Sequence, residues 1–155
     1  MQFDITIQTN FWNKSPSLVI KFDKKPVLEV SNFESDQKRT LQFNLEVTEG
    51  DHQLIIERKN KPIKDTVLKD GKIIKDSTVN LVDIVIDKIS IEPLLDKAKF
   101  FPKYPEPWLT QQKQNGQAPP TMYDYCRTLH HNGDWILDFT TPIHVWFFQN
   151  IAVEI

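Results

Sequence analysis

The sequence contains few of the residues on which several classes of protein depend. Its single cysteine, Cys126, excludes an internal disulfide and a cysteine-rich metal framework. With four glycines in the chain, we expect no glycine-rich loop that binds a phosphate. The P-loop, G-x-G-x-x-G and G-x-S-x-G motifs are all absent. No apolar run is long enough to cross a bilayer, and no secretory signal opens the chain. We therefore expect a non-enzymatic protein with no membrane partner and no export by that route.

The chain also lacks an excess of charge of one sign. Its 155 residues include 19 Lys and Arg against 21 Asp and Glu, so the formal net charge is −2. Nonspecific nucleic-acid binding depends on an excess of positive charge, and we expect no nucleic-acid partner. The chain is as long as one ordinary domain, and its 39% hydrophobic residues are enough for one core.

Alternating apolar residues dominate the first 92 residues. Leu41, Phe43, Leu45 and Val47 alternate with polar residues, and this spacing places all four on one face of a strand. The same pattern predicts six further strands, at residues 3–7, 18–22, 27–30, 53–58, 79–87 and 89–91. Glu49-Gly50 predicts a hairpin over residues 47–54, and a change in apolar parity at Asp87-Lys88 predicts another reversal.

The pattern changes in residues 93–128. Six prolines fall between Pro93 and Pro120, a density of missing amide donors that no central strand tolerates. We expect a proline- and aromatic-rich insertion that runs over the surface, with one helical turn at residues 94–99. Alternation then returns at residues 135–139, and an apolar run follows at 143–148; we assign both to core strands, joined by a turn at Thr141-Pro142.

Many short strands separated by polar turns are typical of two antiparallel sheets packed face to face. We predict that residues 1–155 form a single all-β domain, an antiparallel β-sandwich of the jelly-roll type, with residues 93–128 as the insertion. Trp12, Trp135 and Trp146 lie in or beside the strands, and we expect them in the core.

Two polar clusters have residue types that can carry chemistry. Cys126, His130, His131 and Asp134 offer a nucleophile with a base, or metal ligands; a polar turn before the Trp135 strand is the favoured alternative. The acids at positions 65, 70, 76, 83 and 87 offer oxygens to a calcium ion, for which the loop 65–76 is the first place to look. Lysines alternate with these acids, so a solvated hairpin of mixed charge is favoured there, and the identity of any metal stays open.

The insertion gathers aromatic residues where strand periodicity does not demand burial. Exposed Trp and Tyr rings stack on sugars or fill a partner's pocket. The residues we assign to partner or glycan binding are Phe101, Tyr104, Trp108, Tyr123 and Tyr125. The alternative is that these rings fasten the insertion to the sandwich.

The stretch from Trp12 to Pro93 resembles β-sandwich carbohydrate-binding modules, particularly the calcium-dependent kind that binds xylan. The residues that carry the resemblance are 49–56, with a Gly-x-His-x-Leu turn, then Asn60-Lys61 and the strand 79–86. The resemblance implies a sandwich that binds glycan, with calcium as cofactor. The late acidic positions depart from it, because they do not reproduce a full set of calcium ligands.

A second resemblance covers more of the chain. The residues that carry it are 12–14, 59–61, 65–67, 70–76, 83–87, 133–142 and Trp146. In this order they are similar to small proteins of tailed phages that infect marine bacteria. That family supplies no mechanism, but it implies a setting in which a compact sandwich acts as an accessory or decorating subunit of the capsid or tail.

Three functions follow as hypotheses. The leading one is a structural or interaction module of a phage virion, assembled in the host cytoplasm, with other virion proteins as partners of the insertion. The second is a glycan-binding module, and the third is a small metal-dependent enzyme built on His130, His131 and Asp134. An exposed sheet edge or the aromatic insertion would support an oligomer, whose size the sequence leaves open.

Overall fold

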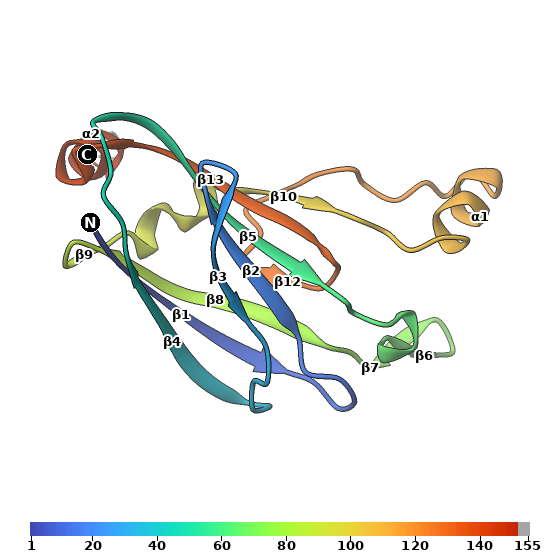
Figure 1. Ribbon diagram of the computed structural model, residues 1–155. Helices are drawn as coiled ribbons and strands as arrows, with labels where there is room; N and C mark the ends of the chain where they lie inside the picture. The colour runs from blue at the N-terminus through green and yellow to red at the C-terminus, as the bar shows by residue number, and fades with distance from the viewer. Residues whose placement is uncertain (152–155) are drawn as a thin grey trace.

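The computed structural model describes residues 1–151 as two layers of antiparallel strands. Figure 1 shows these layers, with the C-terminal helix at one end and a small two-stranded hairpin projecting at the other. The predicted antiparallel β-sandwich is confirmed. Within the described residues, no helix is long and apolar enough to span a membrane.

The first sheet is built on the N-terminal strand. In spatial order its strands are β12 (Thr128–Leu129), β8 (Thr78–Ile86), β1 (Gln2–Asn10) and β4 (Gln37–Asn44), and β9 (Ile89–Ser90) pairs with β8. Phe3 lies opposite Phe43 on one side and Ile86 on the other, so apolar side chains form rows across the sheet. The predicted reversal at Asp87-Lys88 joins β8 to β9, and both residues take a positive φ there.

The second sheet has six strands. In spatial order they are β11 (Tyr123–Asp124), β10 (Lys99–Pro102), β13 (Gly133–Thr141), β5 (Gly50–Lys59), β2 (Ser17–Phe22) and β3 (Lys25–Val30). The long strands β5 and β13 pair over nine positions, from Gly133 opposite Arg58 to Thr141 opposite Gly50. They fix the middle of the sheet, and their ends position the site described below.

One continuous core fills the space between the sheets. Phe3, Ile5 and Ile7 of β1 are buried together with Trp135 and Leu137 of β13, as period-two alternation predicts. Trp135 is fully buried and Trp146 is 6% exposed, so both lie in the core as expected. Trp12 does not, because 46% of its surface is exposed.

The predicted hairpin over residues 47–54 is wrong. Strand β4 pairs with β1 in the first sheet, whereas β5 pairs with β2 and β13 in the second. The segment 45–49 therefore crosses from one sheet to the other instead of reversing within one. Turn chemistry marks a change of direction, but it does not specify which strand pairs with which.

The last predicted strand is also wrong. Residues that we assigned to a core strand at 143–148 belong to helix α2 (Ile143–Ile151), which buries Ile143 and Trp146. The rings of Phe139 and Trp146 meet edge to face at 6.0 Å, so the helix covers the end of β13. A short apolar run has no period that separates a buried strand from a buried helix.

The segment 93–128 is only partly a surface excursion. It begins within the 3₁₀ helix η2 (Glu92–Lys97), close to the expected helical turn. It also contains the seven-residue helix α1 (Trp108–Gln114), at the tip that Figure 1 shows far from the sandwich. Its strands β10, β11 and β12 nevertheless join the two sheets, and β10 has neighbours on both sides. Pro102 is tolerated in β10 because it is the strand's last residue.

Candidate functional site

The predicted aromatic residues of the insertion divide into two groups. Tyr104 contacts Trp108 at a centroid distance of 5.5 Å and His131 at 5.1 Å, and Tyr123 stacks on His131 at 6.4 Å. The Tyr104 hydroxyl donates to the carbonyl of Pro120 at 2.6 Å. These rings contact one another and are half-buried, so they hold the two ends of the insertion together.

Phe101 and Tyr125 lie apart from that ring cluster. They are 40% and 78% exposed, and among the described residues neither takes part in the ring contacts that join Tyr104, Trp108 and Tyr123. The structure therefore does not bring the five predicted residues into one aromatic surface. Their assignment to binding stays a prediction.

The structure brings the cluster around Cys126 together only in part: Cys126, His130 and His131 line one cavity with Asp76, and Asp134 is not among its lining residues. Burial raises the pKa of the Cys126 thiol, which disfavours the nucleophilic thiolate. His130 faces Asp76 at 3.3 Å, whereas the Asp134 carboxylate faces Lys103 at 3.5 Å. His131 packs among the rings of the insertion instead. The three residues proposed as metal ligands thus point to different partners.

The acids of residues 65–76 do not fit a calcium ion either. Asp76 accepts hydrogen bonds from the Lys61 ammonium, the Thr66 hydroxyl and the Ser77 amide at 2.7–2.8 Å. Burial alone would raise the pKa of Asp76, but these donors lower it to about 2. Asp65 is fully buried and accepts from the Asn13 amide at 2.8 Å. Across residues 1–151, no group of three or more His, Cys, Asp and Glu is placed to hold a metal.

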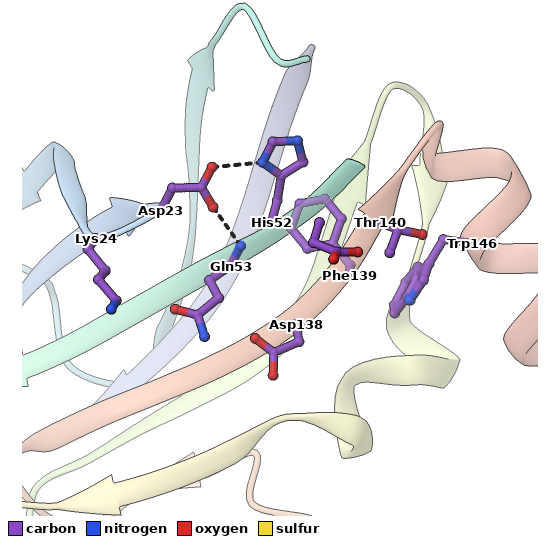
Figure 2. Close-up of a pocket in the computed structure, with 9 residues that line it drawn as sticks. Asp23, Lys24, His52, Gln53, Asp138, Phe139, Thr140 and Trp146 are labelled. Carbon is purple, nitrogen blue, oxygen red and sulfur yellow. Dashed lines mark hydrogen bonds and ion pairs between the residues drawn. The ribbon is translucent and has the colours of Figure 1, made fainter. Parts of the chain in front are cut away.

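Another pocket lies at the opposite end of β5, away from the insertion and the 65–76 loop. This open pocket of about 570 Å³, which we call the β2–β3 pocket, is shown in Figure 2. The turn between β2 and β3 contributes Asp23 and Lys24, and α2 contributes Trp146. The remaining lining residues are Asp51, His52 and Gln53 of β5 with Asp138, Phe139 and Thr140 of β13.

Local sequence explains how this lining is assembled. Asp23 and Lys24 form a two-residue hairpin turn in which both have positive φ, 49° and 70°, as tight reversals between twisted strands require. Gln53 lies directly opposite Asp138 in the β5–β13 pair. Directly opposite residues point to the same face, so these two polar side chains stand side by side on the outer surface of the sheet.

A pair of residues joins the walls of the pocket. The His52 ring bonds through Nδ1 to Asp23 at 2.7 Å and through Nε2 to the Thr48 carbonyl at 2.6 Å. Burial would lower the pKa of His52, but the Asp23 and Thr48 contacts outweigh burial and raise it. Two acceptors on two ring nitrogens suit the imidazolium form, in which both nitrogens donate.

The carboxylate of Asp23 is fixed from the other side as well. Its second oxygen accepts from the backbone N–H of Gln53 at 2.8 Å. Burial opposes ionisation, yet the hydrogen bonds from His52 and Gln53 lower the pKa of Asp23. Figure 2 shows Asp138 and Thr140 facing the pocket without a bond to the other residues drawn. The pocket thus combines a fixed charged wall with unengaged acceptors and donors.

Sequence reasoning missed this site. Asp23, Asp51 and Asp138 come from three separate strands or turns, and only the pairing of β5 with both β2 and β13 brings them together. The one signal in the sequence is the Gly-x-His-x-Leu turn, whose His52 lines the pocket. This turn carries the resemblance in fold. It does not reveal the pocket, because the alternation of apolar residues does not give the order of the strands in the sheet.

Comparison with known proteins supports the fold. No family model matches the chain, and no curated protein matches it in sequence. A solved structure of vCBM60 in complex with galactobiose matches over 88% of this chain and 96% of its own, with a TM-score of 0.52 and 10% identity.

A second solved structure is the selenomethionine form of vCBM60, described as linking two families of calcium-dependent carbohydrate-binding modules by circular permutation. It covers 86% of this chain and 88% of its own, with a TM-score of 0.50 and 10% identity. Neither description refers to a phage particle, so the predicted virion role stays a prediction without support from them. At this identity the chain is similar to carbohydrate-binding modules in fold.

Proposed function

We propose that the protein is a glycan-binding module and that the β2–β3 pocket is its binding site. The observation that carries the proposal is an open pocket, lined by acids, an amide and a hydroxyl, on a sandwich similar to a module solved with galactobiose. The pocket's volume of about 570 Å³ lies in the range of sites for small ligands.

The lining chemistry suits sugars. The hydroxyl groups of a sugar both donate and accept, so they pair with carboxylate, amide and hydroxyl side chains at once. Asp138 and Gln53 stand opposite each other at the base of the pocket and are free to bond neighbouring hydroxyl groups. Phe139 and Trp146 also line the pocket but are 2% and 6% exposed, so the contacts with a sugar fall to the polar side chains.

The family resemblance suggests calcium as a cofactor, but the side chains present do not fit it. The acids of residues 65–76 are bonded to amines, hydroxyls and amides, and one pocket acid is paired with a histidine. We therefore propose that Asp138, Gln53 and Asp51 contact the sugar directly.

A glycan array followed by calorimetric titration of the best saccharide tests the proposal. Asp138→Ala removes a charged acceptor, and we expect it to weaken binding about tenfold or more. Gln53→Ala should act in the same direction with a smaller effect. Both side chains point outward from the sheet, so circular dichroism and the melting temperature should stay unchanged.

Two control variants separate this pocket from the insertion. Asp70→Asn removes an exposed acid far from the pocket and should leave affinity unchanged. Trp108→Ala tests the aromatic insertion. If Trp108→Ala abolishes binding and Asp138→Ala does not, the glycan site lies in the insertion and the pocket assignment is wrong. If the protein binds no saccharide on a broad array, glycan binding is rejected altogether.

A further inference from the structure

The hairpin that projects from the far end of the sandwich has no role in the β2–β3 pocket. It comprises η1 (Ile63–Asp65), β6 (Val67–Lys69) and β7 (Lys72–Lys75), and we call it the basic hairpin. Strands β6 and β7 pair only with each other in a separate two-stranded sheet. Figure 1 shows it extending beyond the ends of β5 and β8. One side of it borders the insertion, because Ile73 lines a cavity shared with Tyr123 and His131.

The structure separates charges that the sequence mixes. Asp65 is fully buried, and the half-buried Asp76 is paired with Lys61 at 2.7 Å, so neither acid adds a free negative charge to the exposed surface of the hairpin. The lysines that remain on the surface are Lys64, Lys69, Lys72 and Lys75. Asp70, at the tip, is the exposed acid of the hairpin. A segment of mixed charge in sequence is therefore strongly positive on its surface, in a chain whose net charge is −2.

The same hairpin exposes large apolar side chains. Ile63, Leu68, Ile73 and Ile74 are each between 54% and 61% exposed. Leu68 lies opposite Ile73 in the strand pair, and Lys69 lies opposite Lys72. Directly opposite residues share a face, so Leu68 and Ile73 lie on one face of the hairpin and Lys69 and Lys72 on the other. Exposed aliphatic groups in this number mark an interaction surface.

A tryptophan stands at the base of the hairpin. Trp12 donates through its indole N–H to the Asp65 carbonyl at 2.8 Å, and the Lys75 ammonium lies 4.8 Å from the centre of its ring. The residue as a whole is 46% exposed. Tryptophans with one end fixed and one end exposed are enriched at the boundary between lipid and water.

We propose that the basic hairpin, together with Trp12, docks on an anionic lipid surface. Lysines near such a surface are attracted to its headgroups, and aliphatic side chains gain by entering the acyl region beneath. The hairpin presents both kinds of side chain on one small projection, and a bilayer offers anionic headgroups directly above acyl chains, so the lysines and the exposed aliphatic groups find partners on the same surface. Docking of this kind needs no membrane-spanning segment, so it does not require a long apolar run. The proposal therefore replaces our expectation that the protein has no membrane partner.

The surface is independent of the proposed glycan site. The β2–β3 pocket is lined by the first residues of β5, and the basic hairpin follows its last. From Gln53 to Lys59 the strand spans about 20 Å. Changes in one site are therefore not expected to alter the other.

Sedimentation of the full chain with lipid vesicles tests the proposal. We expect binding to vesicles of equimolar phosphatidylcholine and phosphatidylserine, weaker binding to phosphatidylcholine alone, and a decrease with added salt. Lys69→Gln with Lys72→Gln should weaken binding about tenfold or more. Leu68→Ser with Ile73→Ser should also weaken it, and Trp12→Phe should remove a blue shift of fluorescence on binding.

The matched control changes two exposed lysines outside the hairpin, Lys88→Gln with Lys97→Gln, and should leave binding unchanged. Failure to bind phosphatidylserine vesicles overturns the proposal, as does an equal loss in the control. A third outcome would also overturn the proposal. If the protein binds polyglutamate but not vesicles, and the Leu68 and Ile73 changes leave that binding unchanged, the partner is an acidic protein.

Discussion

At the scale of single residues, Arg58 links the two sheets from within the core. Its side chain is 1% exposed and donates to the carbonyls of Ser77 and Leu129, both at 2.7 Å. Burial lowers the pKa of Arg58 to about 10, so the guanidinium is still charged at neutral pH. The residue belongs to β5, whereas Leu129 belongs to β12 of the other sheet.

Removing this side chain leaves two buried carbonyls without a donor. We predict that Arg58→Ala lowers the free energy of unfolding by about 3 kcal/mol, because unsatisfied buried groups and a cavity add together. Urea denaturation measures the change. Arg58→Lys keeps the charge but cannot donate to both carbonyls in the same geometry, and it should be intermediate; a change within error in both variants would contradict this account.

The Asp23–His52 pair predicts a pH dependence. The pKa of His52 is raised in the folded state, so its stabilisation is complete below the ordinary value of 6.5 and is lost as the pH rises through the folded pKa. The pKa of Asp23 is lowered, so its contribution is present above 3.8 and is lost as the pH falls through the folded value. We expect unfolding free energies of wild type to decline above pH 6.5, and His52→Gln to flatten that decline.

Asp76 predicts a loss of stability in acid. Because the pKa of Asp76 is lowered to about 2 from 3.8, its contribution is complete above 3.8 and disappears as the pH falls toward 2. Asp76→Asn should remove this part of the acid dependence in thermal melts between those values. An unchanged acid profile would show that the Lys61 and Thr66 contacts do not stabilise the ionised form.

At the scale of elements, the contact between β10 and β13 depends on the absence of a side chain. Gly133 has a φ of 151°, and a Cβ there would overlap the Phe101 carbonyl and lie 2.8 Å from the Cα of Pro102. Strand β13 passes so close to β10 that only glycine fits.

This contact gives a prediction with its own control. Gly133→Ala should destabilise the protein by about 3 kcal/mol, because backbone has to move to admit the methyl group. Gly71→Ala, whose Cβ would meet nothing within 4 Å, should cost only about 1 kcal/mol for its positive φ. Urea denaturation compares the two, and equal costs would show that crowding at β10 is not the cause.

The strands with one buried face could be predicted from sequence, and the elements without that pattern could not. Alternation located β1 and β13, which bury every second residue, and also β5 and β8, where the pattern is interrupted once in each strand. It failed at α2, where apolar residues are continuous, and at β10, where Pro102 suggested that no strand was possible. Strand order was also out of reach, which is why the β2–β3 pocket was missed while its His52 was noticed.

At the scale of the whole molecule, one core joins both sheets. Trp135 reports on that core because it is fully buried. We predict that tryptophan fluorescence and far-ultraviolet circular dichroism follow the same urea transition, as a single cooperative unit requires. A circular dichroism transition that lags behind fluorescence would show that part of the sandwich unfolds separately.

The placement of the pocket and the hairpin at opposite ends of β5 has a consequence for any molecule that used both. Hydrogen-bonded strands do not stretch, so the sandwich would serve as a spacer of constant length. A sugar bound at one end would be held at a constant distance from a bilayer bound at the other end. Its orientation would be set by the rigid sheet and not by a flexible linker.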